Sequence, residues 1–110
     1  MPVPPLGEFE QLVLLGLLRL GPEAYGAAIS LEIERQTGRV VSVSAVHTTL
    51  DRLEDKRLIR SRLGEPTPQR GGKRKRHYEV LPPGVRAVQH ALRGLRRMSA
   101  GLDDLLGDAV

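Results

Sequence analysis

The sequence contains no cysteine and no tryptophan, and its aromatic residues are limited to Phe9, Tyr25 and Tyr78. The lack of cysteine excludes a disulfide framework, a thiolate zinc site and a cysteine nucleophile. Pockets for drug-sized ligands are commonly lined by aromatic and apolar side chains, so the scarcity of aromatic residues leaves no pocket that can be named. Binding of a small-molecule effector therefore stays open, with no residues assigned to it.

Long apolar runs are also missing. The most apolar stretch extends from Leu12 to Leu20 and is interrupted by Arg19, whereas a membrane-spanning helix needs about 20 apolar residues. The N-terminal sequence MPVPPLGEFE has no positively charged segment before an apolar run, so it does not resemble a signal peptide. We therefore expect a cytoplasmic protein that has no membrane partner.

Negative charge is nearly absent from one short segment of this chain. The 110 residues, a length typical of one domain, carry a formal net charge of +4. Residues 1–55 carry a net charge of −4, residues 56–76 carry +8, and residues 77–110 are neutral. A block of positive charge of this kind is a candidate surface for phosphate groups. The alternative is a solvated loop whose charge serves only solubility.

Two amphipathic helices are predicted after a flexible lead at residues 1–5. Within residues 7–20, apolar side chains recur at spacings of three and four, and a Gly-Pro pair ends the run. Within residues 24–37, a narrower apolar stripe recurs every four residues, and Gly38 is placed to end the helix. Both helices therefore have a face that can be buried.

Residues 44–56 form the third predicted helix, and the hydroxyl of Ser42 or Ser44 can cap its start. Its narrow apolar face consists of residues at i, i+4 and i+7, which are Val46, Leu50 and Leu53. The opposite face is small and polar and carries one arginine, unlike the Glu- and Lys-rich faces of helices exposed only for solubility. We expect it to contact a partner through Ser44, His47, Thr48 and Arg52.

Strands are predicted at three places. Val40 and Val41 suit a short strand, and residues 58–63 and 75–81 alternate between apolar and polar side chains. Residues 64–74, between the two longer strands, are rich in glycine and proline and become basic at their far end. This pattern predicts a hairpin with a long basic loop.

The last predicted helix starts near Pro82 and continues through the C-terminal part of the chain. Its apolar residues follow the a and d positions of a heptad, with Ser99 at the one polar a position. Such a seam favours a facing helix, so we predict a homodimer; the alternative is packing only onto the helix's own domain. The predicted interface residues are Phe9, Val88, Leu92, Leu95, Leu102 and Leu106.

The order helix, helix, short strand, helix, strand, loop, strand, helix predicts a mainly α (α+β) fold. It is a winged helix–turn–helix at residues 6–81, followed by a C-terminal dimerisation helix at residues 82–110. In such proteins the second helix of the motif lies in the major groove, and the hairpin loop forms a wing along the DNA backbone. The wing residues expected to contact phosphate are Arg70, Lys73, Arg74 and Arg76.

Four stretches give the sequence a family resemblance: LGEFEQLVLLGLL at 6–18, AYGAAISLEIERQTGRVVS at 24–42, SAVHTTLDRLEDKRLI at 44–59 and RGGKRKRHYEVLPPG at 70–84. Together they resemble the PadR family of bacterial transcriptional regulators. The resemblance implies a homodimer that binds double-stranded operator DNA, usually as a repressor, and that in many relatives responds to a small molecule. Tyr25 is assigned mainly to packing, with a contact of its hydroxyl to phosphate as an alternative.

Some positions depart from the pattern of that family. His47 stands where a tyrosine is usual, Thr48 where a proline is frequent, and Arg57 where a glycine commonly ends the recognition helix. Pro82 replaces the usual serine or threonine cap of the last helix. These departures concern the details of the DNA contacts more than the fold, since the imidazole of His47 can still donate to a phosphate.

Three other classes of function are considered. A non-specific or RNA-binding basic protein would keep the charged wing but would need no helix that fits a groove, and a winged-helix protein-interaction module would need no nucleic acid. An enzyme is the third class. The three histidines, His47, His77 and His90, lie on different predicted elements and have no metal-ligand spacing or paired carboxylates. We therefore predict no catalytic residues, no metal and no cofactor.

Overall fold

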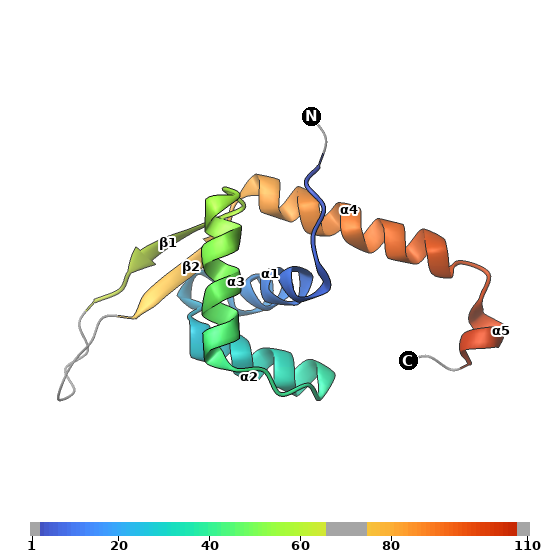
Figure 1. Cartoon of the computed structure of the whole chain (residues 1–110), viewed down its shortest axis with the longest axis horizontal. Coiled ribbons are helices and arrows are strands. Elements are labelled where there is room, and N and C mark those ends of the chain that lie inside the picture. The colour runs from blue at the N-terminus through green and yellow to red at the C-terminus, as the bar shows by residue number, and fades with distance from the viewer. Residues whose placement is uncertain (1–2, 66–74, 108–110) are drawn as a thin grey trace.

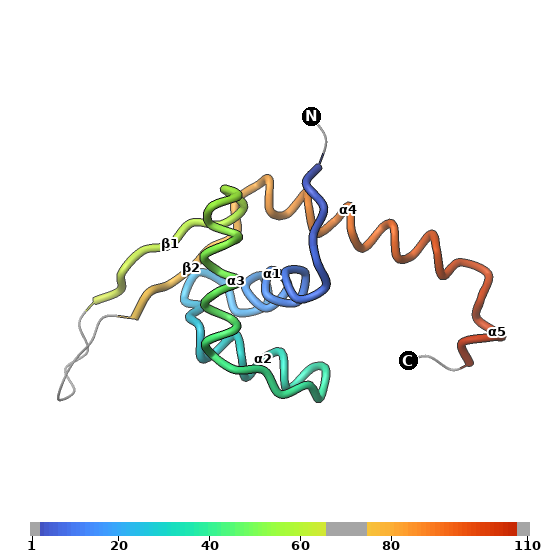
Figure 2. Tube along the Cα trace, in the orientation of Figure 1, coloured from blue at the N-terminus to red at the C-terminus, as the bar shows by residue number. Residues whose placement is uncertain are grey.

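The computed structural model describes residues 3–65 and 75–107. The elements are α1 (Glu8–Leu20), the short 3₁₀ helix η1 (Gly21–Glu23), α2 (Gly26–Thr37), α3 (Val43–Asp55), β1 (Ile59–Leu63), β2 (Arg76–Val80), α4 (Pro82–Ser99) and α5 (Asp103–Leu106). Helices α1, α2 and α3 cross one another, while the hairpin projects on one side and α4 on the other (Figures 1 and 2). The prediction of a mainly helical fold with a small antiparallel sheet is confirmed.

The core lies where the three crossing helices meet the base of the hairpin and the first turns of α4. Its buried apolar residues are Val13, Leu14, Leu17, Ala24, Ile29, Ile33, Val46, Leu50, Leu53, Leu58, Ile59, Tyr78, Ala87 and Val88. The apolar stripes of the sequence therefore serve packing between elements. Within the two described ranges, no helix is both long and apolar enough to cross a membrane.

The hairpin is joined to the helices through one of its faces. β1 and β2 pair antiparallel with Ile59 opposite Val80 and Ser61 opposite Tyr78. Because side chains alternate along a strand, these residues share one face. On this face Tyr78 is buried, and the Ser61 hydroxyl donates to a carboxylate oxygen of Glu54 in α3 at 2.7 Å. The base of the hairpin is thus held against α3.

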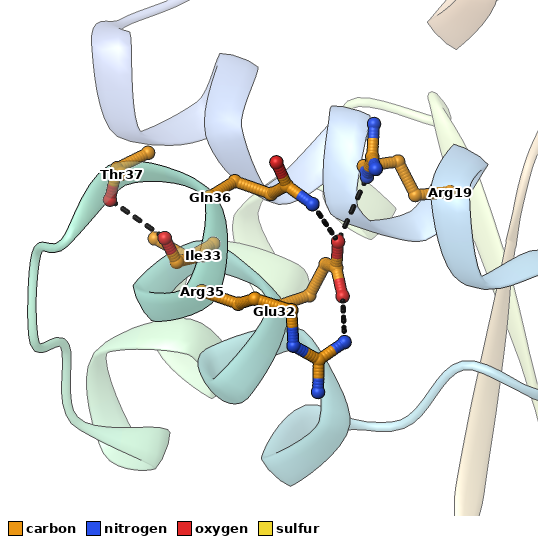
Figure 3. A network of polar contacts seen from close by, with 6 residues as sticks. All are labelled: Arg19, Glu32, Ile33, Arg35, Gln36 and Thr37. Atoms are coloured by element: carbon orange, nitrogen blue, oxygen red, sulfur yellow. Dashed lines mark hydrogen bonds and ion pairs between the residues drawn. The ribbon is translucent and has the colours of Figure 1, made fainter.

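Two carboxylates hold α1 against its neighbours. Glu32 in α2 is buried and accepts hydrogen bonds from Arg19, Arg35 and Gln36 (Figure 3), each at 2.9 Å. Hydrogen bonds from Gln36 and Arg19 lower the pKa of Glu32, against the opposing effect of burial. This carboxylate therefore stays ionised and ties α1 to α2.

The second carboxylate, Glu10, connects the first turn of α1 to the end of α3. It accepts from the Lys56 ammonium at 2.8 Å and from the Gly7 N–H at 2.9 Å. Burial alone would raise the pKa of Glu10, but the hydrogen bonds from Lys56 and Gly7 and the charges of Lys56 and Arg52 lower it overall. The C-terminal end of α3 is therefore anchored by an ionised side chain.

The prediction of a short strand at Val40 and Val41 is wrong. Residues 38–42 have no regular secondary structure and make the turn between α2 and α3. Gly38 adopts a left-handed conformation (φ 75°), and the carbonyl of Val41 accepts from the Ser30 hydroxyl at 2.8 Å. Ser42 then caps α3, because its side chain accepts from the N–H of Ala45 at 3.0 Å. The Val41 carbonyl and the Ser42 side chain thus have hydrogen-bond partners in α2 and α3, without a strand partner.

The expectation of one long helix from Pro82 past Leu102 is also wrong. α4 ends at Ser99, Gly101 takes a left-handed backbone conformation (φ 81°), and α5 starts at Asp103. A left-handed residue reverses the direction of the chain, and glycine adopts it at no steric cost. Leu102 and Leu106 therefore do not continue the heptad of α4 in register.

Close packing at the start of α4 requires a glycine at position 84. Gly84 is buried in the first turn of α4, where an added Cβ would collide with the carbonyl oxygen of Leu58 and lie 2.7 Å from Cγ1 of Val80. The Leu58 carbonyl cannot move away easily, since it accepts from the Leu81 N–H at 2.9 Å. The first turn of α4 can thus lie directly on the turn before β1.

Gly84→Ala is therefore expected to lower the free energy of unfolding by about 1–3 kcal/mol, the usual cost of overpacking a core. Urea denaturation measures this change. Gly94→Ala is the matched control: Gly94 lies in the same helix with no atom within 4 Å of an added Cβ, so its greater helix propensity should stabilise by about 1 kcal/mol. Losses of similar size in both variants would contradict this explanation.

Candidate nucleic-acid interface

The outer face of α3 is a ridge of small polar and acidic side chains. Ser44, Thr48, Asp51 and Asp55 are all exposed, and their spacing of four, three and four residues places them along one side of the helix, opposite the buried Val46. The Thr48 hydroxyl donates to the Ser44 carbonyl at 3.1 Å, within the same helix. The structure thus brings Ser44 and Thr48 together on an open surface at the N-terminal half of α3.

His47 lies beside this ridge, against the start of α2. Gly26 is buried there, and an added Cβ would be 2.5 Å from Nε2 of His47. The glycine thus lets the imidazole lie directly over the first turn of α2 while the residue as a whole remains exposed. This contact explains why a glycine stands at residue 26.

A cationic and aromatic cluster continues this surface toward the hairpin. The Lys75 ammonium lies 4.2 Å from the centre of the Tyr25 ring, and the ring of His77 meets Tyr25 edge-on at 6.2 Å between centroids. Nδ1 of His77 is hydrogen-bonded to the Glu23 carbonyl at 3.0 Å. Sequence reasoning missed Lys75 as a site residue, although its place in the KRKR run next to Arg76 was a signal.

Arg76 and Arg52 lie on different sides of α3. The Arg76 guanidinium donates to the Ser61 hydroxyl at 3.0 Å, on the hairpin face that is turned toward α3. Arg52 is exposed, and its charge helps to lower the pKa of Glu10, which places it on the α1 side. The three other predicted wing residues, Arg70, Lys73 and Arg74, lie outside the described residues.

The basic segment at residues 56–76 is partly neutralised by acids that are distant in the sequence. Three ion pairs account for this: Lys56 with Glu10, Arg60 with Glu79 and Arg62 with Glu23. Among residues 3–65 and 75–107, Arg57, Lys75 and Arg76 have no carboxylate within ion-pair distance. The net charge of the segment therefore overstates the positive surface at the base of the hairpin.

Helix α4 extends away from the body of the molecule (Figure 1). Five large apolar residues of α4 and the segment after it are exposed: Leu95, Met98, Leu102, Leu105 and Leu106. Of the other predicted interface residues, Leu92 packs partly against the core, and Phe9 is half-buried with the Arg39 guanidinium 5.5 Å from its ring centre. Val88 is only 2% exposed, so it belongs to the chain's own core and offers almost no surface to a partner.

Comparison with known families decides what kind of protein carries this surface. The sequence profile described as "Transcriptional regulator PadR-like family" matches residues 14–90, which is more than half of the chain. The chain belongs to the PadR-like family. The matched range includes α2, α3, the hairpin and the first turns of α4. This PadR-like chain is therefore a DNA-binding transcriptional regulator and not an enzyme.

Solved structures of other PadR proteins share the fold. A PadR family regulator from Clostridium difficile R20291 superposes with a TM-score of 0.70 at 22% identity, covering 92% of this chain and 100% of that one. A PadR-like regulator (BC4206) from Bacillus cereus ATCC 14579 gives 0.70 at 19% identity, with 89% and 90% covered. A PadR family regulator from Eggerthella lenta DSM 2243 gives 0.66 at 23% identity, with 92% and 88% covered. A search of curated proteins gives no significant match.

Proposed function

We propose that this PadR-like regulator is a cytoplasmic homodimeric repressor that binds a pseudo-palindromic operator. Residues 6–81 would form the DNA-binding unit and residues 82–110 the dimerising part. The observation that carries the proposal is the exposed polar ridge at the N-terminal half of α3, flanked by Lys75 and Arg76 at the base of the hairpin. A helix of this kind fits the major groove, which is about 12 Å wide.

Base contacts are assigned to the N-terminal half of α3. The small side chains of Ser44 and Thr48 allow the helix backbone to approach the base edges closely, where their hydroxyl groups can donate or accept. His47, which lies over Gly26, would contact a phosphate at the edge of the groove. Arg52, on the α1 side of the helix, would contact a phosphate or a guanine.

Phosphate contacts are assigned to the wing. Lys75 and Arg76 have no carboxylate within ion-pair distance among the described residues, so their charges can displace cations from the DNA backbone. The remaining predicted wing residues, Arg70, Lys73 and Arg74, would extend this contact. Tyr25 would support the phosphate contact of Lys75 indirectly, since its ring contacts the Lys75 ammonium.

Dimerisation is assigned to the exposed apolar residues of α4 and the segment after it. Leu95 is 59% exposed and Leu102 39% exposed, and burial of such side chains against a second copy would remove apolar surface from water. Leu92 and Leu106 would extend the interface on either side. A two-fold dimer would present two α3 helices to half-sites spaced by about one helical turn of DNA, or a multiple of it.

Selection of bound sequences from a random DNA pool, followed by footprinting at moderate salt, tests the proposal. A repressor of this kind is expected to enrich a two-fold related sequence and to protect it as a discrete footprint. Uniform coating of DNA, or equal binding to RNA, would instead indicate a non-specific basic protein. Absence of nucleic-acid binding would indicate a protein-interaction module. A reporter gene placed behind the selected operator then tests repression.

Arg76→Ala is expected to weaken binding to all DNA sequences alike and to reduce the salt dependence of log K by about one unit, the value for one lost phosphate contact. Titrations at several salt concentrations measure this slope. Arg93→Ala is the control, because Arg93 is exposed in α4 and its loss removes the same charge away from α3 and the hairpin. An unchanged slope in the Arg76 variant would argue against a backbone contact at this residue.

A further inference from the structure

An acidic residue lies in the middle of the surface that is proposed to face DNA. Asp51 is exposed and stands three residues after Thr48 and seven after Ser44 on the ridge of α3. With a rise of 1.5 Å per residue, it lies about 10 Å along the helix axis from Ser44. A helix that places Ser44 and Thr48 in the major groove therefore places the Asp51 carboxylate there as well.

Among the described residues, no cation lies within ion-pair distance of Asp51. On the hairpin side, the Arg76 guanidinium is held at the Ser61 hydroxyl, and that hydroxyl donates to Glu54. The carboxylate thus stands on the ridge as an exposed negative charge.

The surroundings of Tyr78 show on which side of the ridge this charge acts. Burial raises the pKa of Tyr78, the charge of Arg76 opposes this effect, and the charges of Asp51 and Glu54 add to it. The charge of Asp51 is therefore felt on the hairpin side of α3.

A carboxylate on a groove-facing surface can accept hydrogen bonds but cannot donate them. Guanine and the thymine O4 present acceptors in the major groove, so they offer an ionised Asp nothing to bind. Adenine presents its N6 amino group next to the N7 acceptor, which repels a carboxylate. Cytosine presents only the N4 amino donor, and Asp or Glu accepting from this group is an established type of base contact.

We propose that Asp51 is a specificity-determining residue that accepts a hydrogen bond from the N4 amino group of a cytosine in each operator half-site. The inference rests on the proposed function, since it requires α3 to enter the major groove. Near phosphates the charge disfavours binding to every DNA sequence, and the contact with cytosine offsets this penalty only at the correct site. The residue thus increases the ratio of specific to non-specific affinity.

Sequence selection with the wild type, Asp51→Ala and Asp51→Asn tests the inference. The wild type is expected to select cytosine at one position of each half-site. Asp51→Ala should lose this preference, with discrimination against other bases falling by about 5- to 100-fold, the range for one good base contact. Asp51→Asn should shift the preference to adenine, because an amide pairs with N6 and N7 together. Both variants should bind random DNA more tightly.

Asp55→Asn is the matched control. It removes the same charge from the same ridge one turn further along, at the end of α3 and away from the N-terminal residues that read bases. It should tighten binding to random DNA and leave the base preference unchanged. Selection of the same cytosine by Asp51→Ala would overturn the inference while leaving the proposed function intact. A wild type that selects no sequence would contradict both.

Discussion

Replacing Leu95 and Leu102 together with aspartate is expected to convert the proposed dimer into a 12.1 kDa monomer and to weaken binding to a two-half-site operator by about 10²–10⁴-fold. The two side chains are 59% and 39% exposed within one chain, so the core of the monomer does not need them. A dimer would bury them, and buried aspartates without partners would prevent association. The loss of affinity follows because the two half-sites would then be bound independently.

Light scattering after size exclusion measures the mass, and titration with DNA carrying one or two half-sites measures the affinity. Binding to a single half-site should change little, since α4 extends from the body on the side opposite the hairpin (Figure 1). Leu31→Asp is the matched control, because Leu31 is 60% exposed on α2 and is not part of the proposed interface. A double variant that remains dimeric would exclude this surface as the interface.

The helices could be predicted because their signals are local. Spacings of three and four residues located α1, α2 and α3, and the hydroxyl of Ser42 caps α3 as one of two predicted alternatives. The end of α4 could not be located in this way. The heptad of apolar residues continues in the sequence past Ser99, but the backbone reverses at Gly101. A pattern of side chains does not report a left-handed residue, and a glycine only permits one.

The electrostatics of the site were less predictable than its location. The ridge of α3 follows from helix geometry, so the exposure of Ser44 and Thr48 on one face could be predicted from the sequence alone. The partners of Lys56, Arg60 and Arg62 are 46, 19 and 39 residues away, and only folding shows that these charges are paired. The contact of Lys75 with Tyr25 could not be predicted for the same reason, since it joins the hairpin to the start of α2.

Thr48→Glu is expected to weaken operator binding by about 100-fold or more, because a charge facing like charges across an interface costs several kcal/mol. The position lies between Ser44 and Asp51 on the ridge, so the new carboxylate would face the DNA together with them. Folding should be unaffected, since Thr48 is exposed and its hydroxyl bonds only to the Ser44 carbonyl of the same helix. Thermal denaturation checks the fold, and a gel-shift titration measures the affinity.

Two further variants distinguish a contact from a general charge effect. Gln89→Glu adds the same charge to an exposed position of α4 and should change affinity only slightly at moderate salt, where charges farther apart than about 10 Å are screened. Thr48→Ser keeps the hydroxyl and should retain most of the affinity. Equal losses from Thr48→Glu and Gln89→Glu would mean that net charge, rather than the α3 ridge, governs binding. A large loss from Thr48→Glu alone would place this ridge against the DNA.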